Sequence, residues 1–144
     1  MIYNNMTKYF KSDNEEYYLL NGKKEGIYKI YYDNSKCECY YINGKKNGFY
    51  FEYNNDGLLM NKCFFKNGLL EGNDIHYYND GKIESIYTYK NGKLFGEFKQ
   101  YYDNGQLRVS SNYINGNIDG EYIDYFENGE INTKCFYNNG EIKK

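Results

Sequence analysis

The sequence predicts an all-β protein, an elongated open antiparallel meander sheet of repeated β-hairpins with about eleven or twelve strands. First, all fifteen glycines recur at three fixed offsets. Second, Asn-Gly and Asp-Gly pairs, a strong hairpin signal, fall at the joints between β-prone runs. Third, the chain has no Pro, which would remove ladder donors, and no window follows a helical period.

The best-defined repeat spans residues 96–119. Its opening glycine is Gly96, its middle glycine Gly105 lies nine residues later, and its closing glycine Gly116 lies eleven residues beyond that. Opening glycines recur 22 or 24 residues apart, at Gly26, Gly48, Gly72, Gly96 and Gly120. A fixed period of this length is typical of repeat proteins. We therefore expect one repeat domain over 1–144, with a degenerate unit at 1–25 followed by units at 26–47, 48–71, 72–95, 96–119 and 120–144.

Each unit is expected to form one hairpin. With the opening glycine counted as zero, a three-residue loop with a left-handed glycine pairs position six with ten, five with eleven and three with thirteen. In the first two units Asp13 and Ser35 replace the middle glycine, so we expect a second arm two residues shorter. We assign every glycine to a turn.

This pairing predicts two different faces. One face carries Leu or Ile at position eleven, and mostly aromatic residues at position seventeen together with Tyr at position five. The opposite face carries positions two and six, with mostly polar residues at position four between them. Because neither face is wholly apolar, a single twisted sheet is expected rather than a sandwich. Closure of the sheet on itself is the structural alternative.

Composition limits the function classes. With 40% hydrophobic and 21% aromatic residues in 144, the chain is expected to fold as one domain rather than remain disordered. The net charge of -2, with both signs scattered, predicts no nucleic-acid partner and argues against a membrane surface. No signal-peptide pattern opens the sequence, so we expect a cytoplasmic protein, although a leader removed upstream would leave the same sequence.

The repeat, written G-E-x-x-x-Y-Y-x-N-G-x-L followed by Y-x-N-G-x-x-x-G, resembles the MORN repeat. It is most similar to the bacterial variant that is often described as the antitoxin of a toxin–antitoxin pair. The resemblance covers nearly the whole chain and is clearest from Gly48 to Lys144. It implies a β-hairpin repeat fold and a binding or scaffolding module.

The sequence offers no catalytic constellation. Its single histidine, His76, lies at position four, where other units have Glu52 or Gln100, and it has no recurring nucleophile or carboxylate partner. We therefore predict a surface histidine, no enzyme activity, no catalytic residues and no cofactor.

The four cysteines predict neither a disulfide framework nor a metal site. Cys39 and Cys63 occupy equivalent positions two strands apart, about 9 to 10 Å, which exceeds the roughly 7 Å limit for a disulfide. Cys37 and Cys39 are two residues apart, unlike the Cys-x-x-Cys spacing of structural zinc sites. Reduced thiols and no bound metal are expected.

The aromatic ladder is the candidate binding surface. It comprises Tyr31, Tyr53, Tyr77, Tyr101, Tyr125, Tyr89, Tyr113 and Tyr137. A structural role accounts for such a ladder, because Tyr favours strands and covers the backbone of a thin sheet. The functional interpretation is a groove for an extended peptide, a partner strand or a sugar chain.

The leading functional prediction is a non-enzymatic protein-interaction or scaffold module, in the antitoxin case one that neutralises an unidentified partner protein. Carbohydrate or cell-wall binding is the alternative, although the absence of Trp counts against it. An open sheet also has two unpaired edges, so edge-strand pairing with a second copy or a partner strand is a further hypothesis, with residues 134–137 as the template.

Overall fold

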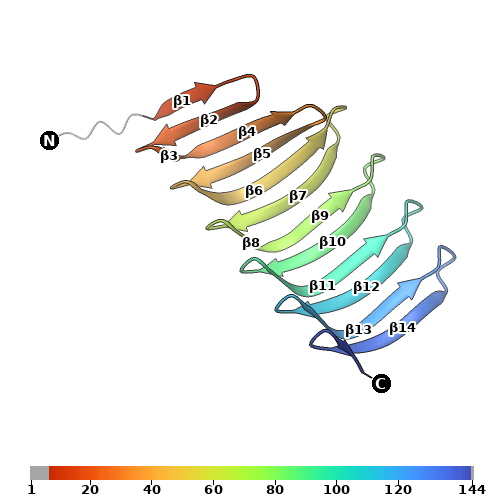
Figure 1. The fold of residues 1–144 in the computed structure, drawn as a ribbon. Helices are drawn as coiled ribbons and strands as arrows, with labels where there is room; N and C mark the ends of the chain where they lie inside the picture. The colour runs from red at the N-terminus through yellow and green to blue at the C-terminus, as the bar shows by residue number, and fades with distance from the viewer. Residues whose placement is uncertain (1–6, 144) are drawn as a thin grey trace. The chain divides into compact units, whose positions relative to one another are not determined.

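The computed structural model describes residues 7–143, and these form β-strands joined by turns (Figure 1). The prediction of an all-β, open antiparallel meander of hairpins is confirmed. The described range contains no helix that is long and apolar enough to cross a membrane. The chain divides into two compact units, residues Met1–Leu69 and Leu70–Lys144. From here on they are called the first and second unit, and the 22- or 24-residue hairpin segments are called repeats.

Within each unit, successive strands pair in chain order (Figure 1). The first unit contains β1 (Lys8–Lys11), β2 (Glu15–Leu20), β3 (Lys23–Lys24), β4 (Gly26–Tyr32), β5 (Ser35–Ile42), β6 (Lys45–Asn54) and β7 (Leu59–Lys66). The second contains β9 (Gly72–Tyr77), β10 (Ile83–Lys90), β11 (Lys93–Tyr101), β12 (Leu107–Ile114), β13 (Asn117–Tyr125), β14 (Ile131–Asn138) and β15 (Glu141–Ile142). The short strand β8 (Leu69–Leu70) includes the last residue of the first unit and the first of the second.

The described residues form fifteen strands, slightly more than the expected eleven or twelve. The difference comes from β3, β8 and β15, which are two residues long and follow closing turns. In the other repeats the residues after the closing turn form the first part of one longer strand, β6, β11 or β13.

The closing turns are two-residue loops with both residues in the left-handed region. Asn91 has φ 51° and Gly92 has φ 77°, and Lys90 pairs with Lys93 across them. The backbone twist of a turn with two successive positive φ values matches the right-handed twist of the flanking strands, which explains the repeated Asn-Gly pair. Asn adopts this region more readily than other side chains.

The middle turns confirm the expected three-residue loop. Tyr102 N donates to Gln106 O at 2.8 Å, and Gly105, with φ 86°, donates its N–H to Tyr102 O at 2.9 Å. This is the predicted pairing of position six with ten. The pairing of position five with eleven is also confirmed, as in Tyr101 with Leu107.

The next predicted pair is wrong because each three-residue loop is followed by a β-bulge. Gln100, not Lys99, pairs with Val109, so Arg108 at position twelve has no opposite residue. The same shift occurs in the other hairpins of this type, at Met60, Glu84 and Asn132. One extra residue reverses the alternation of every residue that follows it.

The bulge therefore changes which residues share a face. Position seventeen lies with positions two and four rather than with position five. Tyr113 pairs with Gly96, and its ring lies 6.2 Å from that of Phe98 in an edge-to-face arrangement. The expected grouping of the two tyrosine columns on one face is wrong.

The opening glycines do not lie in hairpin turns, contrary to our assignment. Tyr89 pairs with Leu94 and Tyr87 with Phe98, so only Thr88 faces the three residues 95–97. Gly96 lies in the middle of this register shift with φ 103°. A residue without a Cβ is required because the strand bends there through the left-handed region.

The expectation of a shortened second arm is wrong for residues 26–47, whereas β2 in the degenerate first repeat does have only six residues. Strand β5 has eight residues, as do β7, β10, β12 and β14. Instead, Tyr32 pairs with Ser35 across a two-residue loop, and Ile30 pairs with Cys37 without a bulge. Compared with the longer repeats, this hairpin lacks one loop residue and the bulge residue. Its later residues therefore lie on the same faces as their counterparts in the other repeats.

We define the packed face as positions two, four, thirteen, fifteen and seventeen, and the open face as positions one, three, five, fourteen and sixteen. The repeat at 26–47 is two residues shorter, so we add two to each position after its loop. Cys37, for example, then has position thirteen, like Asn61 and Val109. The buried residues all lie on the packed face, at positions thirteen and fifteen: Cys37, Cys39, Asn61, Cys63, Ser85, Val109 and Ser111. No large side chain in the described range is fully buried, as expected for a single-layer sheet.

Candidate functional site

The centre of the packed face in the first unit holds neutral thiols. The Tyr50 hydroxyl donates to Cys37 Sγ at 3.0 Å and lies 3.3 Å from Glu52 Oε2. Burial raises the pKa of the Cys37 and Cys39 thiols. None of the four cysteines forms a disulfide, and their surroundings favour the protonated, unreactive form of the buried pair Cys37 and Cys39.

Aromatic pairs between positions two and seventeen cover the rest of the packed face. Their ring centroids lie 5.6 to 6.2 Å apart in Tyr28–Tyr41, Tyr50–Phe65, Phe98–Tyr113 and Tyr122–Tyr137. The residue two after each closing glycine lies beside such a pair. In the first unit it is a lysine, with Lys46 Nζ 4.8 Å from the ring centres of both Tyr50 and Phe65. These contacts stabilise neighbouring strands against one another.

Three of the predicted site residues belong to this packed arrangement. Tyr89, Tyr113 and Tyr137 pair with Leu94, Ile118 and Ile142, the aliphatic counterparts of Lys46. Burial raises the pKa of the Tyr113 hydroxyl. Their half-buried surroundings favour the structural interpretation of this column.

The five tyrosines at position five lie on the open face. In the second unit Tyr77, Tyr101 and Tyr125 are half-buried and pair with Ile83, Leu107 and Ile131. The structure therefore divides the predicted ladder between two faces.

In the first unit the structure does bring two of these tyrosines to one place. Tyr31 and Tyr53 line an open pocket of about 460 Å³ together with Lys36. The Lys36 ammonium lies 5.0 Å from the centre of the Tyr53 ring, and the Tyr31 hydroxyl donates to Glu16 Oε1 at 3.4 Å.

The tyrosines at position six have a structural role that the sequence did not indicate. The Tyr78 hydroxyl donates to Tyr101 O at 2.6 Å, and Tyr102 donates to Tyr125 O at 2.8 Å. Each bond joins one hairpin loop to the next repeat. The aromatic preference at this position was visible in the sequence, but its partner is a backbone group.

The largest feature that the sequence reasoning missed is a row of apolar side chains on the open face of the first unit. We call it the apolar row: Tyr9, Tyr18, Ile27, Tyr40, Phe49 and Phe64, one from each of β1, β2, β4, β5, β6 and β7. The first five are 51, 40, 52, 43 and 51% exposed, respectively. In these repeats the row occupies positions one and sixteen, which our incorrect pairing did not place together.

Neighbouring members of the apolar row contact one another. The rings of Tyr9 and Tyr18 lie 5.0 Å apart, and those of Phe49 and Phe64 lie 5.2 Å apart. Ile27 pairs with Tyr40 across β4 and β5. The row therefore consists of cross-strand pairs on neighbouring strands rather than scattered apolar residues.

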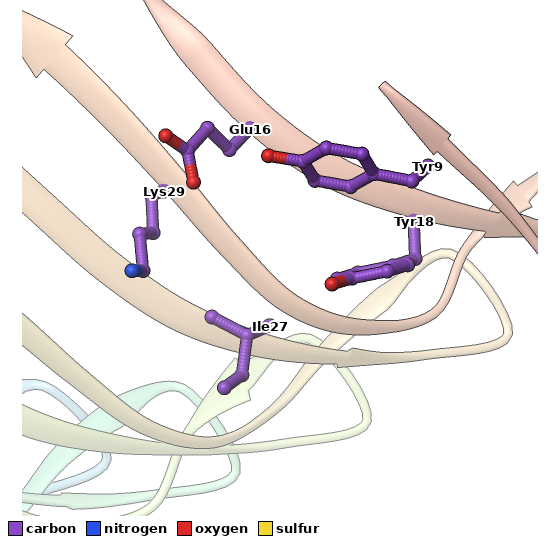
Figure 2. A pocket seen from close by; sticks show the side chains of 5 residues that line it. All are labelled: Tyr9, Glu16, Tyr18, Ile27 and Lys29. Atoms are coloured by element: carbon purple, nitrogen blue, oxygen red, sulfur yellow. The ribbon is translucent and has the colours of Figure 1, made fainter. Parts of the chain in front are cut away.

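A pocket of about 130 Å³ lies at the N-terminal end of the row (Figure 2). Tyr9, Tyr18 and Ile27 form its apolar wall, and Glu16 and Lys29 lie on the opposite side. Glu16 forms a 2.8 Å ion pair with Lys11, which lowers the pKa of the Glu16 carboxyl.

The corresponding positions of the second unit are mainly polar. Asn73 pairs with Thr88, Glu97 with Asn112, and Glu121 with Phe136. The repeat geometry therefore tolerates polar residues at these positions. The apolar row is a feature of the first unit and not a requirement of the fold.

The histidine lies on the packed face. His76 Nε2 is 3.5 Å from Asp74 Oδ1, and its ring meets Tyr87 edge to face at 5.7 Å. Among residues 7–143 no group of three or more His, Cys, Asp or Glu side chains is arranged to hold a metal ion.

The family comparison identifies three repeats. Residues 70–91, 96–115 and 118–139 match the family model described as the MORN repeat variant. All three matched segments lie in the second compact unit. The resemblance seen in the repeat pattern is thus supported for these three repeats.

Comparison with other proteins gives only distant likenesses. No curated protein matches the chain. A crystal structure of the GtfA/B complex bound to UDP and GlcNAc is similar over 91% of this chain and 24% of that chain, with 12% identity and a TM-score of 0.32. A crystal structure of TarM is similar over 94% of this chain and 22% of that chain, with 16% identity and a TM-score of 0.33. This chain spans less than a quarter of those solved chains.

Proposed function

We propose that the protein is a non-enzymatic protein-interaction module. The observation that carries the proposal is the apolar row left exposed on the open face of the first unit. Aromatic side chains offer roughly 150 to 250 Å² each, so five half-exposed members present on the order of 500 Å² of surface. The largest apolar patch on a typical soluble monomer is about this size and is often a binding site.

The repeat type supports the same proposal. Repeats of the MORN class generally serve as interaction modules for proteins or membranes, and three segments of this chain match that class. The small net charge of -2 favours a protein over an anionic membrane as the partner. Antitoxin-like neutralisation is a narrower form of the proposal, in which the partner is a toxin.

The test is the isolation and reconstitution of a complex. Affinity capture with the full chain, followed by purification of each candidate, is expected to give one protein that binds at a defined stoichiometry in calorimetry. If that partner is toxic when expressed alone and harmless with this chain, the antitoxin form is supported. If no purified protein binds while vesicles or glycans do, the proposal is wrong.

Carbohydrate or cell-wall binding is the second candidate. The pocket between Tyr31 and Tyr53 favours it, since it combines two aromatic side chains with polar groups of Lys36, Asn54 and Asn55. Retention on peptidoglycan that is lost in a Tyr31→Ser, Tyr53→Ser variant would support this function. Equal elution of both proteins from a panel of glycans would reject it.

A cytoplasmic location is part of the proposal. The thiols of the four cysteines, which form no disulfide, would remain reduced in that compartment. Fractionation of cells with an antibody to the native protein tests this location directly. Recovery in the extracellular or cell-wall fraction would contradict it.

A further inference from the structure

We propose that the open face of the first unit docks an acidic amphipathic α-helix of a partner protein, laid across the strands along the apolar row. This inference rests on the proposed interaction function and names the partner's binding element. The apolar stripe of the helix covers Tyr9, Tyr18, Ile27, Tyr40 and Phe49, and its acidic side faces a line of lysines.

The spacing of the row favours a helix over an extended peptide. The row supplies one side chain per strand, and strands lie about 4.8 Å apart. A helix presents apolar residues once per turn of about 5.4 Å, whereas a β-strand presents them about every 6.7 Å. Over the five intervals of the row, about 24 Å, the mismatch is about 3 Å for a helix and about 10 Å for a strand. Only the helix keeps each apolar side chain near its own strand.

The lysines that define the charge of the partner are Lys23, Lys45 and Lys66, here called the lysine line. Lys45 pairs with Ile42, and the adjacent Lys46 points to the packed face, so Lys45 projects from the open face. Lys24 likewise lies over the Tyr28 ring on the packed face, which puts Lys23 on the open face.

The lysine line borders the row on the side of the closing turns. Lys66 is on the open face because the preceding residue, Phe65, packs against Tyr50. Lys23 and Lys45 each follow the closing glycine of successive hairpins, about 9.6 Å apart, close to the roughly 10.5 Å between helix residues i and i+7. Acidic residues seven positions apart on a helix would therefore meet Lys23 and Lys45, while Lys66 lies on β7, one strand beyond β6.

The opposite border of the row is internally compensated. Glu16 pairs with Lys11 at 2.8 Å, and Glu38 lies 4.0 Å from Lys29 and 2.9 Å from Lys36. These are two carboxylates and three lysines, so this border does not favour a basic helix either, and the lysine line determines the polarity of the helix. The first unit also carries ten Lys against eight Asp and Glu, whereas the second carries eight Lys and Arg against twelve.

The carboxylates beside the row also favour a protein occupant over a membrane. Inserting Tyr18 and Ile27 into an anionic lipid surface would bring Glu16 and Glu38 to the same depth, because all four lie on the open face. Like charges repel, and this cost opposes the attraction of the lysines for lipid. A helix can place its acidic side over the lysine line and its apolar stripe over the row, so that its charged side chains lie away from Glu16 and Glu38.

The pocket in Figure 2 supplies the anchor of the proposed complex. Its volume of about 130 Å³ suits one apolar side chain, and Tyr9, Tyr18 and Ile27 supply the apolar contacts. Interfaces concentrate their binding energy where one side chain fills a pocket next to a flatter apolar surface.

The probe for this proposal is a labelled peptide of three heptads, with Leu along one face and Glu along one flank. Fluorescence anisotropy with the full-length protein measures its binding. Its matched control replaces each Glu with Lys. We expect the acidic peptide to bind at least tenfold more tightly than the basic one, with an affinity that falls as salt increases.

The matched protein variant uses residues that the chain itself places at equivalent positions. Ile27→Asn and Tyr40→Thr copy Asn73 and Thr88, while Phe49→Glu and Phe64→Asn copy Glu97 and Asn112. The fold accommodates these residues in the second unit, so the variant is expected to stay folded by circular dichroism. Binding of the acidic peptide should fall at least tenfold.

Two further variants separate the parts of the site. The double variant Lys23→Glu, Lys45→Glu should weaken the acidic peptide at least tenfold and remove its advantage over the basic peptide. The control Lys90→Glu, Lys93→Glu makes the same change of charge across one closing turn of the second unit, where Lys93 is the counterpart of Lys45. It should leave binding within twofold.

Several outcomes would overturn the inference. These are no binding of the acidic peptide, equal binding of both peptides, binding only to vesicles that contain anionic lipid, or a concentration-dependent dimer that the four-residue variant abolishes. The proposed function would survive any of them if a purified protein partner still bound by another surface. It would fail separately if no protein partner bound at all.

Discussion

At the scale of single residues, the opening glycines tolerate substitution unequally. Gly48 has φ 128°, and a Cβ at this position would lie 3.2 Å from the Cβ of Tyr40. Gly120 has φ 101°, but a Cβ there would meet no heavy atom within 4 Å. Both positions strain an L side chain, and only Gly48 also meets a neighbouring side chain.

This difference predicts unequal costs for two chemically identical substitutions. Gly120→Ala should reduce the free energy of unfolding by about 1 kcal/mol because of its left-handed backbone. Gly48→Ala should cost about 1 kcal/mol more, because Tyr40 must also move. Urea denaturation of both variants measures the difference. Equal costs would show that backbone strain alone decides.

A second residue-scale pattern stabilises the closing turns. The side chain before an opening glycine accepts a hydrogen bond from the turn Asn N–H: Glu25 with Asn43 at 2.8 Å, Asn47 with Asn67 at 3.0 Å, Glu71 with Asn91 at 2.8 Å and Asp119 with Asn139 at 2.9 Å. The residue before the remaining opening glycine, Gly96, is Phe95, whose side chain has no hydrogen-bond acceptor.

Removing one of these acceptors tests the pattern. Glu71→Ala should destabilise the protein by about 1 kcal/mol, the usual net value of one hydrogen bond. Glu71→Gln keeps an acceptor oxygen, as Asn47 does naturally, and should cost less than half as much. Thermal unfolding compares the two variants with the wild type. Identical losses would mean that charge or packing, not the acceptor, is what Glu71 supplies.

At the scale of strands and turns, the sequence predicts the hairpins correctly and their faces incorrectly. Asn91-Gly92 specifies its turn, since few other pairs adopt two successive left-handed residues. The bulge residue carries no such signal: it is Met60, Glu84, Arg108 or Asn132 in successive repeats. Its position depends on strand twist and pairing, which single-residue preferences do not determine. The candidate site was therefore grouped wrongly and the apolar row was missed.

The loop tyrosines connect one hairpin to the next. Tyr78→Phe removes the hydroxyl that donates to Tyr101 O at 2.6 Å and leaves that carbonyl without this donor. We expect a loss of about 1 kcal/mol in the free energy of unfolding. Tyr32→Phe is the control at the same repeat position, because the Tyr32 side chain is 58% exposed. A loss of similar size in Tyr32→Phe would reject the hydrogen-bond explanation.

The ion pair between β1 and β2 predicts a pH dependence. The hydrogen bond from Lys11 is the main cause that lowers the Glu16 pKa below its ordinary value of 4.5. Because the folded pKa is the lower one, the pair stabilises the fold above pH 4.5, and this contribution is lost as the pH falls through the folded pKa. The stability difference between the wild type and Glu16→Gln should therefore shrink in acid.

Urea denaturation at pH 6 and pH 3 checks this expectation. Lys11→Met removes the partner and should show the same loss of pH dependence. A difference between the wild type and Glu16→Gln that stays constant from pH 6 to pH 3 would instead indicate a packing effect.

At the scale of the whole molecule, stability should be local. Strands pair with their sequence neighbours within each unit, and no large side chain in residues 7–143 is fully buried. In repeat proteins of this kind, stability is approximately a sum of repeat and nearest-neighbour terms. A local defect should therefore not weaken all strands equally.

Hydrogen exchange of Gly48→Ala tests this expectation. Amides of β5, β6 and β7 should exchange faster than in the wild type, because the substitution lies in β6. Amides of β12, β13 and β14 should keep their protection. Uniformly faster exchange across both units would show that the whole chain unfolds as one cooperative body.

The separation of packed and open faces has a consequence for how such chains can diversify. Positions one and sixteen contribute little to burial, as their polar residues in the second unit show, so they can change without loss of the fold. Duplicating one hairpin with apolar residues there would lengthen the recognition surface by about 9.6 Å. Each duplication would then increase the length of the recognised partner helix by nearly two turns. The length of the binding surface would thus change in steps of one repeat.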